Sequence, residues 1–173
     1  MKAEPKQGLF LGRFQPFHNG HLEVIRKALT VVDSLIIVIG SAQESHTAEN
    51  PFTADEREEM IEKTVRVEKI KNVEIIPIED INDDERYVSY VENLVPSFTL
   101  VFAAENPLTA KLFKDKAYEV WTCDRITPYE STKIRELMRK GDAEWKQMVP
   151  SAVAEIVEDV EGVQRIQGIV NPR

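Results

Sequence analysis

The chain has 173 residues, of which 42% are hydrophobic and 30% charged, with a formal net charge of −8 and one cysteine. This length fits one α/β domain, residues 1–173, and leaves little room for a second catalytic domain. The negative charge argues against nonspecific binding to nucleic acid or an anionic membrane, and no apolar run approaches the roughly 20 residues that span a bilayer. Since no secretory signal is evident at the N-terminus, we expect a cytoplasmic protein.

From the N-terminus, continuous apolar runs alternate with amphipathic stretches, the pattern of repeated βα units around a parallel sheet. Residues 8–12, GLFLG, are the first expected strand. From Gly20 the apolar residues recur at helical spacing, and a second strand is expected at 34–40. A capping-box pattern after Thr53 starts the next helix, which we expect to end near Val67.

The same alternation continues through the second half of the chain. Helices are expected at 87–95, at 131–140 and from Pro150 onward, and Gly141 is a typical C-terminal stop for the second of them. The expected strands of this half are 73–78, 99–103 and 118–122. The whole order of elements therefore predicts an α/β fold around a parallel sheet.

The segment 12–21, GRFQPFHNGH, lies between the first strand and the first helix, where open parallel sheets place ligands. His18 and His21 are three residues apart near a helix start, so both can point at one phosphate chain. Arg13 adds a fork-shaped, permanently charged donor. The structural alternative is that the two histidines are helix caps or metal ligands, although no third zinc ligand stands in a readable pattern.

These residues carry a resemblance to a known family. HNGH at 18–21 matches the HxGH signature of the nucleotidyltransferase superfamily, and the longer string resembles the archaeal-type nicotinamide mononucleotide (NMN) adenylyltransferases. HxGH alone also admits phosphopantetheine adenylyltransferase, FMN adenylyltransferases and cytidylyltransferases. The resemblance covers nearly the whole chain and implies a Rossmann-like parallel sheet flanked by helices, with a small helical C-terminal extension. It implies that ATP is bound by Gly12, Phe14, Gln15 and Gly20.

A second candidate site opens the helix expected at 131–140. By itself the segment would be an ordinary Ser/Thr helix cap. It is similar, however, to the ISSTxIR motif of the same family, and this resemblance implies that Ser131, Thr132 and Arg135 bind the terminal phosphates of ATP. Glu130 departs from the motif, because it brings negative charge to a position that has a hydroxyl in the family. Lys133 fills the variable position, where its charge either assists the phosphates or lies in solvent.

Two further segments are expected to bind the second substrate, and a third is expected to contact nucleotide. GSAQESHTAENPFTADER, residues 40–57, resembles the family's SAQxSHTxxNPFT pattern, with Ser41, Gln43 and His46 as hydrogen-bonding groups. The alternative is a polar loop with helix caps.

The third strand ends in Ile78-Glu79-Asp80-Ile81, where Asp80 is a candidate binding residue, and a loop follows from Asn82 to Tyr87. The resemblance implies that this loop holds the nicotinamide, with Tyr87 stacking on the ring. Core packing of Tyr87 is an equally open interpretation. After the fourth strand, Asn106 corresponds to a family turn that contacts nucleotide, and Pro107 is expected to begin a helix. Glu105 is less expected there.

The resemblance implies that NMN attacks the α-phosphorus of ATP and forms NAD and pyrophosphate. Arg13, His18, His21 and Arg135 would orient the phosphates and neutralise charge in the transition state. We expect Mg²⁺ to arrive with ATP rather than in a protein metal site. Another acceptor, such as FMN, phosphopantetheine or nicotinate mononucleotide, and a non-catalytic nucleotide sensor remain alternatives. The family suggests a homo-oligomer, with neither nucleic acid nor membrane as a partner.

Overall fold

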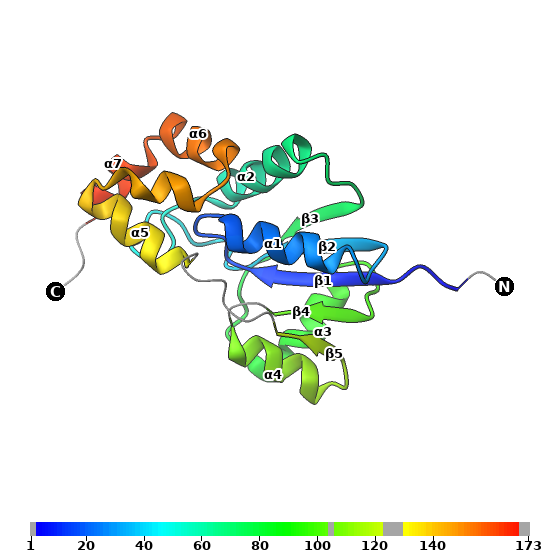
Figure 1. Ribbon diagram of the computed structural model, residues 1–173. Coiled ribbons are helices and arrows are strands. Elements are labelled where there is room, and N and C mark those ends of the chain that lie inside the picture. Colours follow the sequence, from blue (N-terminus) through cyan, green and yellow to red (C-terminus); the bar gives the residue numbers. More distant parts are fainter. Residues whose placement is uncertain (1–2, 104–105, 123–129, 170–173) are drawn as a thin grey trace.

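The computed structural model describes residues 3–103, 106–122 and 130–169. At its centre is a five-stranded, all-parallel sheet with the strand order β3-β2-β1-β4-β5 (Figure 1). The chain builds outward from β1 through β2 to β3 and then returns to the other side of β1, so the strand order reverses between β1 and β4. The strands are β1 Gln7–Gly12, β2 Ser34–Ile39, β3 Val73–Pro77, β4 Leu100–Phe102 and β5 Glu119–Trp121.

Helices cover both faces of the sheet, because successive side chains of a strand point to opposite faces. Phe10 of β1 packs in one apolar cluster with residues of α1 and α2, whereas its neighbour Leu9 packs in another with residues of α3 and α4. Each strand of the centre is buried on both sides, which explains why its sequence is a continuous apolar run. The flanking helices are α1 Asn19–Ala28, α2 Ala54–Val67, α3 Asp84–Leu94 and α4 Pro107–Asp115.

The chain after residue 130 forms a small helical extension at the end of the sheet beside α2 (Figure 1). Its elements are α5 Ser131–Lys140, the 3₁₀ helix η1 Ala143–Met148, α6 Ser151–Asp159 and α7 Gly162–Gly168. Among the described helices, none combines the length and the apolar composition needed to cross a bilayer. The parallel sheet, the helices on both of its faces and the C-terminal helices together confirm the predicted Rossmann-like fold with its helical extension.

Several boundaries differ from the sequence-based expectation. Helix α3 begins at Asp84 rather than Tyr87, because Asp83 accepts a hydrogen bond from the backbone N–H of Arg86 and caps a polar first turn. The final helical stretch is divided in two at Glu161, whose φ of 53° lies in the left-handed region. Neither η1 nor this division was predicted from the sequence.

The first turn of α2 ties the extension to the rest of the fold. Thr53 and Glu56 form the predicted capping box. The Glu56 carboxylate also accepts two hydrogen bonds from Arg165 of α7, at 2.7 and 2.8 Å, and Arg165 donates a third to the carbonyl of Pro51. Burial alone would raise the pKa of Glu56, but the bonds from Arg165 and the Thr53 backbone outweigh it and hold that pKa below its usual value.

This pKa shift makes the stability of the fold depend on pH. Because the folded-state pKa of Glu56 is lowered, the stabilisation is complete above the unfolded-state pKa of 4.5 and is lost as pH falls below it toward the folded-state pKa. We expect Glu56→Gln to lower the free energy of unfolding at neutral pH by about 1–3 kcal/mol. Urea unfolding at several pH values should show a smaller loss of stability below about pH 5 in the variant than in the wild type. Parallel pH profiles would contradict this prediction.

Candidate functional site

A cavity of about 350 Å³ lies at the carboxyl ends of the strands. Its walls come from the segments after β1, β2, β3 and β4 and from the start of α5, so it occupies the region where the strand order reverses. Eleven of the predicted site residues line this cavity: Gly12, Arg13, Phe14, Gln15, Ser41, Asp80, Tyr87, Asn106, Ser131, Thr132 and Arg135. The predicted ATP-binding and acceptor-binding segments therefore converge on one space.

The loop after β1 is held in place by its own side chains. The Gln15 amide donates to the carbonyl of Phe52 and accepts from the backbone N–H of Phe52, both at 2.9 Å. A Cβ atom added at Gly12 would lie 2.9 Å from the ring of Phe14, so the loop needs a glycine at that position. The side chain of Gln15 is thus part of the frame of the loop, and its contact with ATP stays a prediction.

His18 and His21 are both buried and form a reciprocal cap at the start of α1. Nδ1 of His18 accepts the backbone N–H of His21 at 3.3 Å, and Nδ1 of His21 accepts the backbone N–H of His18 at 3.1 Å. The two rings stack with their centroids 3.6 Å apart. Because each Nδ1 is an acceptor, the proton of each neutral imidazole belongs on Nε2.

The two histidines therefore cap α1, as the structural alternative predicted. It leaves the predicted phosphate role open, since the cap uses the Nδ1 atoms and fixes the direction of both rings. Gly20, also in this first turn, is buried. Neither ring lines the cavity directly, and Phe14, which does, packs edge-on against His21 with the ring centroids 4.7 Å apart.

Helix α5 docks its first turn onto the loop after β1. Arg135 donates from Nη1 to the carbonyl of Gln15 at 2.9 Å, and the Ser131 hydroxyl donates to the carbonyl of Pro16 at 3.3 Å. These contacts join segments more than a hundred residues apart in sequence. Glu130, the N-cap residue of α5, also lines the cavity, so its carboxylate lies on the same wall as Arg135.

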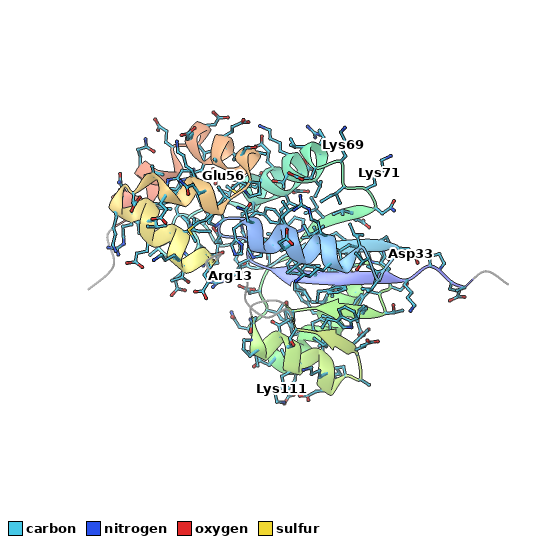
Figure 2. All side chains as sticks on the ribbon, viewed as in Figure 1. Arg13, Asp33, Glu56, Lys69, Lys71 and Lys111 are labelled. Atoms are coloured by element: carbon cyan, nitrogen blue, oxygen red, sulfur yellow. The ribbon has the colours of Figure 1, made fainter. Side chains whose placement is uncertain are left out.

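Arg13, which directly follows β1, is a second cation among the described residues that line the cavity (Figure 2). Its Nη1 donates to Oδ1 of Asn50 at 3.3 Å. The backbone N–H of Asn50 donates in turn to the Thr47 hydroxyl oxygen at 3.0 Å. The polar segment after β2 thus holds the Arg13 side chain through Asn50.

The loops after β2 and β3 are linked by a reciprocal pair of hydrogen bonds. The Gln43 amide donates to the Asp80 carboxylate at 3.2 Å and accepts from the Asp80 backbone N–H at 3.1 Å. Gln43 is exposed and lies outside the cavity wall, whereas Asp80 is part of it. His46, which is 3.0 Å from the Ser45 hydroxyl, and Lys133 are also exposed and outside the wall. Ligand contacts by Gln43, His46 and Lys133 stay predictions.

Tyr87 and Asn106 line the cavity and also stabilise the fold. The Tyr87 ring packs edge-on against Phe113, so part of it belongs to the core. Burial raises the pKa of Tyr87 to about 12, with a further contribution from the Asp80 charge, so its phenol is neutral at physiological pH. Asn106 Oδ1 caps α4, which begins at Pro107 as predicted. Glu105 lies outside the described residues.

Arg57 of α2 is a buried residue whose place at the site was not predicted from the sequence. Its guanidinium donates to the carbonyls of Arg13 and Gly40 at 2.8 Å and of Ser41 at 3.1 Å, all of which belong to cavity-lining residues. Burial lowers the pKa of Arg57 to about 10, helped by the Arg13 charge, so the group is still a cation at neutral pH. Arg57 stands at helical spacing from Met60, Ile61 and Thr64, the other buried residues of α2. This spacing was the available sign in the sequence that Arg57 is buried too.

Comparison with known proteins agrees with this arrangement. Residues 9–139 match the cytidylyltransferase-like family. The chain is 46% identical over 164 residues to the nicotinamide-nucleotide adenylyltransferase of Thermoplasma acidophilum, a similarity that covers 94% of this chain and 90% of that protein. It is 44% identical over 170 residues to the protein of the same name from Archaeoglobus fulgidus, covering 94% and 97%.

A solved structure shares the fold. The bifunctional NMN adenylyltransferase/ADP-ribose pyrophosphatase from Francisella tularensis, crystallised with AMP and a manganese ion, aligns with a TM-score of 0.73 and 23% identity. The match covers 94% of this chain and 52% of that one, so this chain spans about half the length of the solved protein. The family match and the close archaeal relatives show that the chain belongs to the cytidylyltransferase-like family and, within it, to the nicotinamide-nucleotide adenylyltransferases.

Proposed function

We propose that this chain transfers the adenylyl group of ATP to NMN, forming NAD and pyrophosphate. The observation that carries the proposal is the docking of α5 on the loop after β1, where Arg135 donates to the Gln15 carbonyl. This contact brings two predicted phosphate-binding segments to one cavity at the reversal of the strand order. The archaeal relatives that cover nearly all of this chain carry the same activity in their names.

In the proposed reaction, an oxygen of the NMN 5′-phosphate attacks the α-phosphorus of ATP. A new phosphorus–oxygen bond joins the two nucleotides while the bond to the β-phosphate breaks, and pyrophosphate leaves with the electron pair. Arg13 and Arg135 would orient the phosphates and stabilise the charge that shifts onto the leaving group. The first turn of α5, with the hydroxyls of Ser131 and Thr132, would supply N–H and O–H donors to the same phosphates.

His18 and His21 would act on the leaving pyrophosphate through their Nε2 protons. Because the reciprocal cap fixes both rings before substrate arrives, these donors need no reorganisation during the reaction. Positioned donors of this kind stabilise negative charge more in the transition state than in the ground state.

MgATP is the expected form of the nucleotide substrate. In the part of the chain that the structure describes, no three His, Cys, Asp or Glu side chains gather to hold a metal ion. Oxygen atoms of the ATP phosphates and water suit Mg²⁺ without such a cluster, and the cation would neutralise part of the phosphate charge. The cation would thus be part of the substrate.

The acceptor would bind against the loops after β2 and β3. Tyr87 presents a neutral aromatic ring to the cavity, and Asp80, held by Gln43, presents a carboxylate. An aromatic face suits stacking of the nicotinamide ring. From the sequence we also predict that the chain is one domain over residues 1–173. We predict further that the protein resides in the cytoplasm and assembles as a homo-oligomer.

The reaction itself is tested by supplying MgATP with one acceptor at a time. We expect pyrophosphate and a dinucleotide in equal amounts with NMN, and much slower turnover with FMN or phosphopantetheine; nicotinate mononucleotide is measured in parallel. Both products are quantified, so that ATP hydrolysis is not counted as transfer. Faster turnover with FMN would overturn the choice of acceptor. ATP binding without pyrophosphate release for any acceptor would favour a nucleotide sensor, an alternative that the carboxylate of Glu130 on the cavity wall supports.

The role of His21 is tested by His21→Ala. Loss of a donor to the transition state should lower kcat by about 10²–10³-fold. Loss of the helix cap should lower the free energy of unfolding by about 1 kcal/mol. Normal turnover of folded His21→Ala would show that the histidine is a cap alone.

Asn19→Ala is a matched control for this variant. Asn19 is at the same helix start, and its side chain donates to the distant carbonyl of Gln147 in the helical extension. The control should therefore lose stability and keep its kcat, which separates the effect of a weakened helix start from the loss of a donor to the transition state.

A further inference from the structure

We infer that Arg57 is a positioning residue, which sets the geometry of the phosphate-binding loop by holding the loops after β1 and β2 together. The inference rests on the proposed function, and it adds a residue that lies behind the cavity rather than in its wall. Arg57 reaches these loops from the first half of α2, with its side chain fully buried.

The contacts of Arg57 span both loops with a single rigid group. Nη1 donates to the carbonyl of Arg13, after β1, and to the carbonyl of Gly40, after β2. Nη2 donates to the carbonyl of Ser41, and Nε donates to the carbonyl of Thr53 at the start of its own helix. Because a guanidinium is planar and its donors have fixed directions, these bonds set the separation of the two loops as well as their connection.

The acceptor carbonyls flank two residues in unfavourable backbone conformations. Phe14 has a φ of 55° and Ser41 a φ of 50°, in the left-handed region that costs a non-glycine residue about 1–2 kcal/mol. The Arg13 carbonyl belongs to the peptide before Phe14, the Gly40 carbonyl to the peptide before Ser41, and the third acceptor to Ser41 itself. Surrounding structure must hold such residues in place, and Arg57 fixes the peptides on which both depend.

Arg165 provides an internal comparison. It is a partly buried arginine that also bonds a backbone carbonyl, and it ties α7 to the first turn of α2. Its acceptors are Pro51 and Glu56, and neither of these lines the cavity. Arg165 therefore stabilises the same region of the fold. It contacts the loop after β2 only near its end, at Pro51, and it bonds none of the three cavity-lining carbonyls that Arg57 holds.

The test compares Arg57→Lys with Arg165→Lys in the full chain. Lysine keeps the positive charge but presents its donors from one atom, so it cannot hold all the carbonyls in their present directions. We expect Arg57→Lys to lower kcat/KM for NAD formation by about 10–100-fold, because small displacements of positioning groups have effects of this size. Arg165→Lys should lower the melting temperature and keep kcat/KM within about twofold of wild type. Kinetics are measured well below the melting temperature of each variant.

Amide hydrogen exchange without substrate supplies a second readout that does not depend on the reaction. Peptides covering 12–18 and 40–46 should exchange faster in Arg57→Lys than in wild type, while Arg165→Lys leaves them unchanged. Normal kcat/KM in folded Arg57→Lys, or unchanged exchange of both segments, would overturn the inference. If the wild type makes no NAD, the proposed function fails by itself, and the exchange experiment still decides whether Arg57 positions the loops. In Arg57→Met, the same two peptides should exchange even faster than they do in Arg57→Lys.

Discussion

The buried guanidinium of Arg57, on α2, holds together the loops after β1 and β2, which both line the cavity. Removing a charged group from water costs several kcal/mol, and burial accordingly lowers the pKa of Arg57. Charge-assisted hydrogen bonds to backbone carbonyls offset this cost only when the loops take their present conformation. The fold therefore couples its stability to the shape of the site, because a loop that moves away leaves a buried cation poorly solvated.

Many side chains predicted to belong to the site also stabilise the protein. The histidines cap α1, Asn106 caps α4, and Gln15 bonds the backbone of Phe52. Such contacts fix side-chain directions before a ligand binds, which lowers the entropy lost on binding. They also mean that a structural explanation and a functional one are compatible for the same residue. For His18 and His21 the two explanations use different nitrogen atoms.

The strands and most helices were predictable because their sequence signals are local. Continuous apolar runs indicated the buried strands, and Thr53 with Glu56 indicated the start of α2. The start of α3 and the division between α6 and α7 were not predicted, since a polar first turn and a left-handed residue leave no apolar periodicity. For the site, the loop after β1 was found from its position between a strand and a helix, and the other segments were found from their resemblance to the motifs of the family. Contacts such as the fork of Arg57 depend on which carbonyls the tertiary fold brings together, and a helical arginine gives little sign of them.

In the proposed function an acidic protein must bind a polyanion, and directed hydrogen-bond donors explain this better than net charge does. The chain carries a net charge of −8, and the cavity wall combines the cations Arg13 and Arg135 with the carboxylates of Asp80 and Glu130. Because the described part of the wall mixes both signs of charge, general electrostatic attraction would explain little of the proposed binding. Recognition of phosphate in the proposed function must instead come from donors held in fixed directions, the guanidinium forks and the start of α5. Such donors act over hydrogen-bond distances, so their geometry matters more than the net charge. In the proposed function, the contacts that fix the positions of these donors would therefore affect the rate of the reaction.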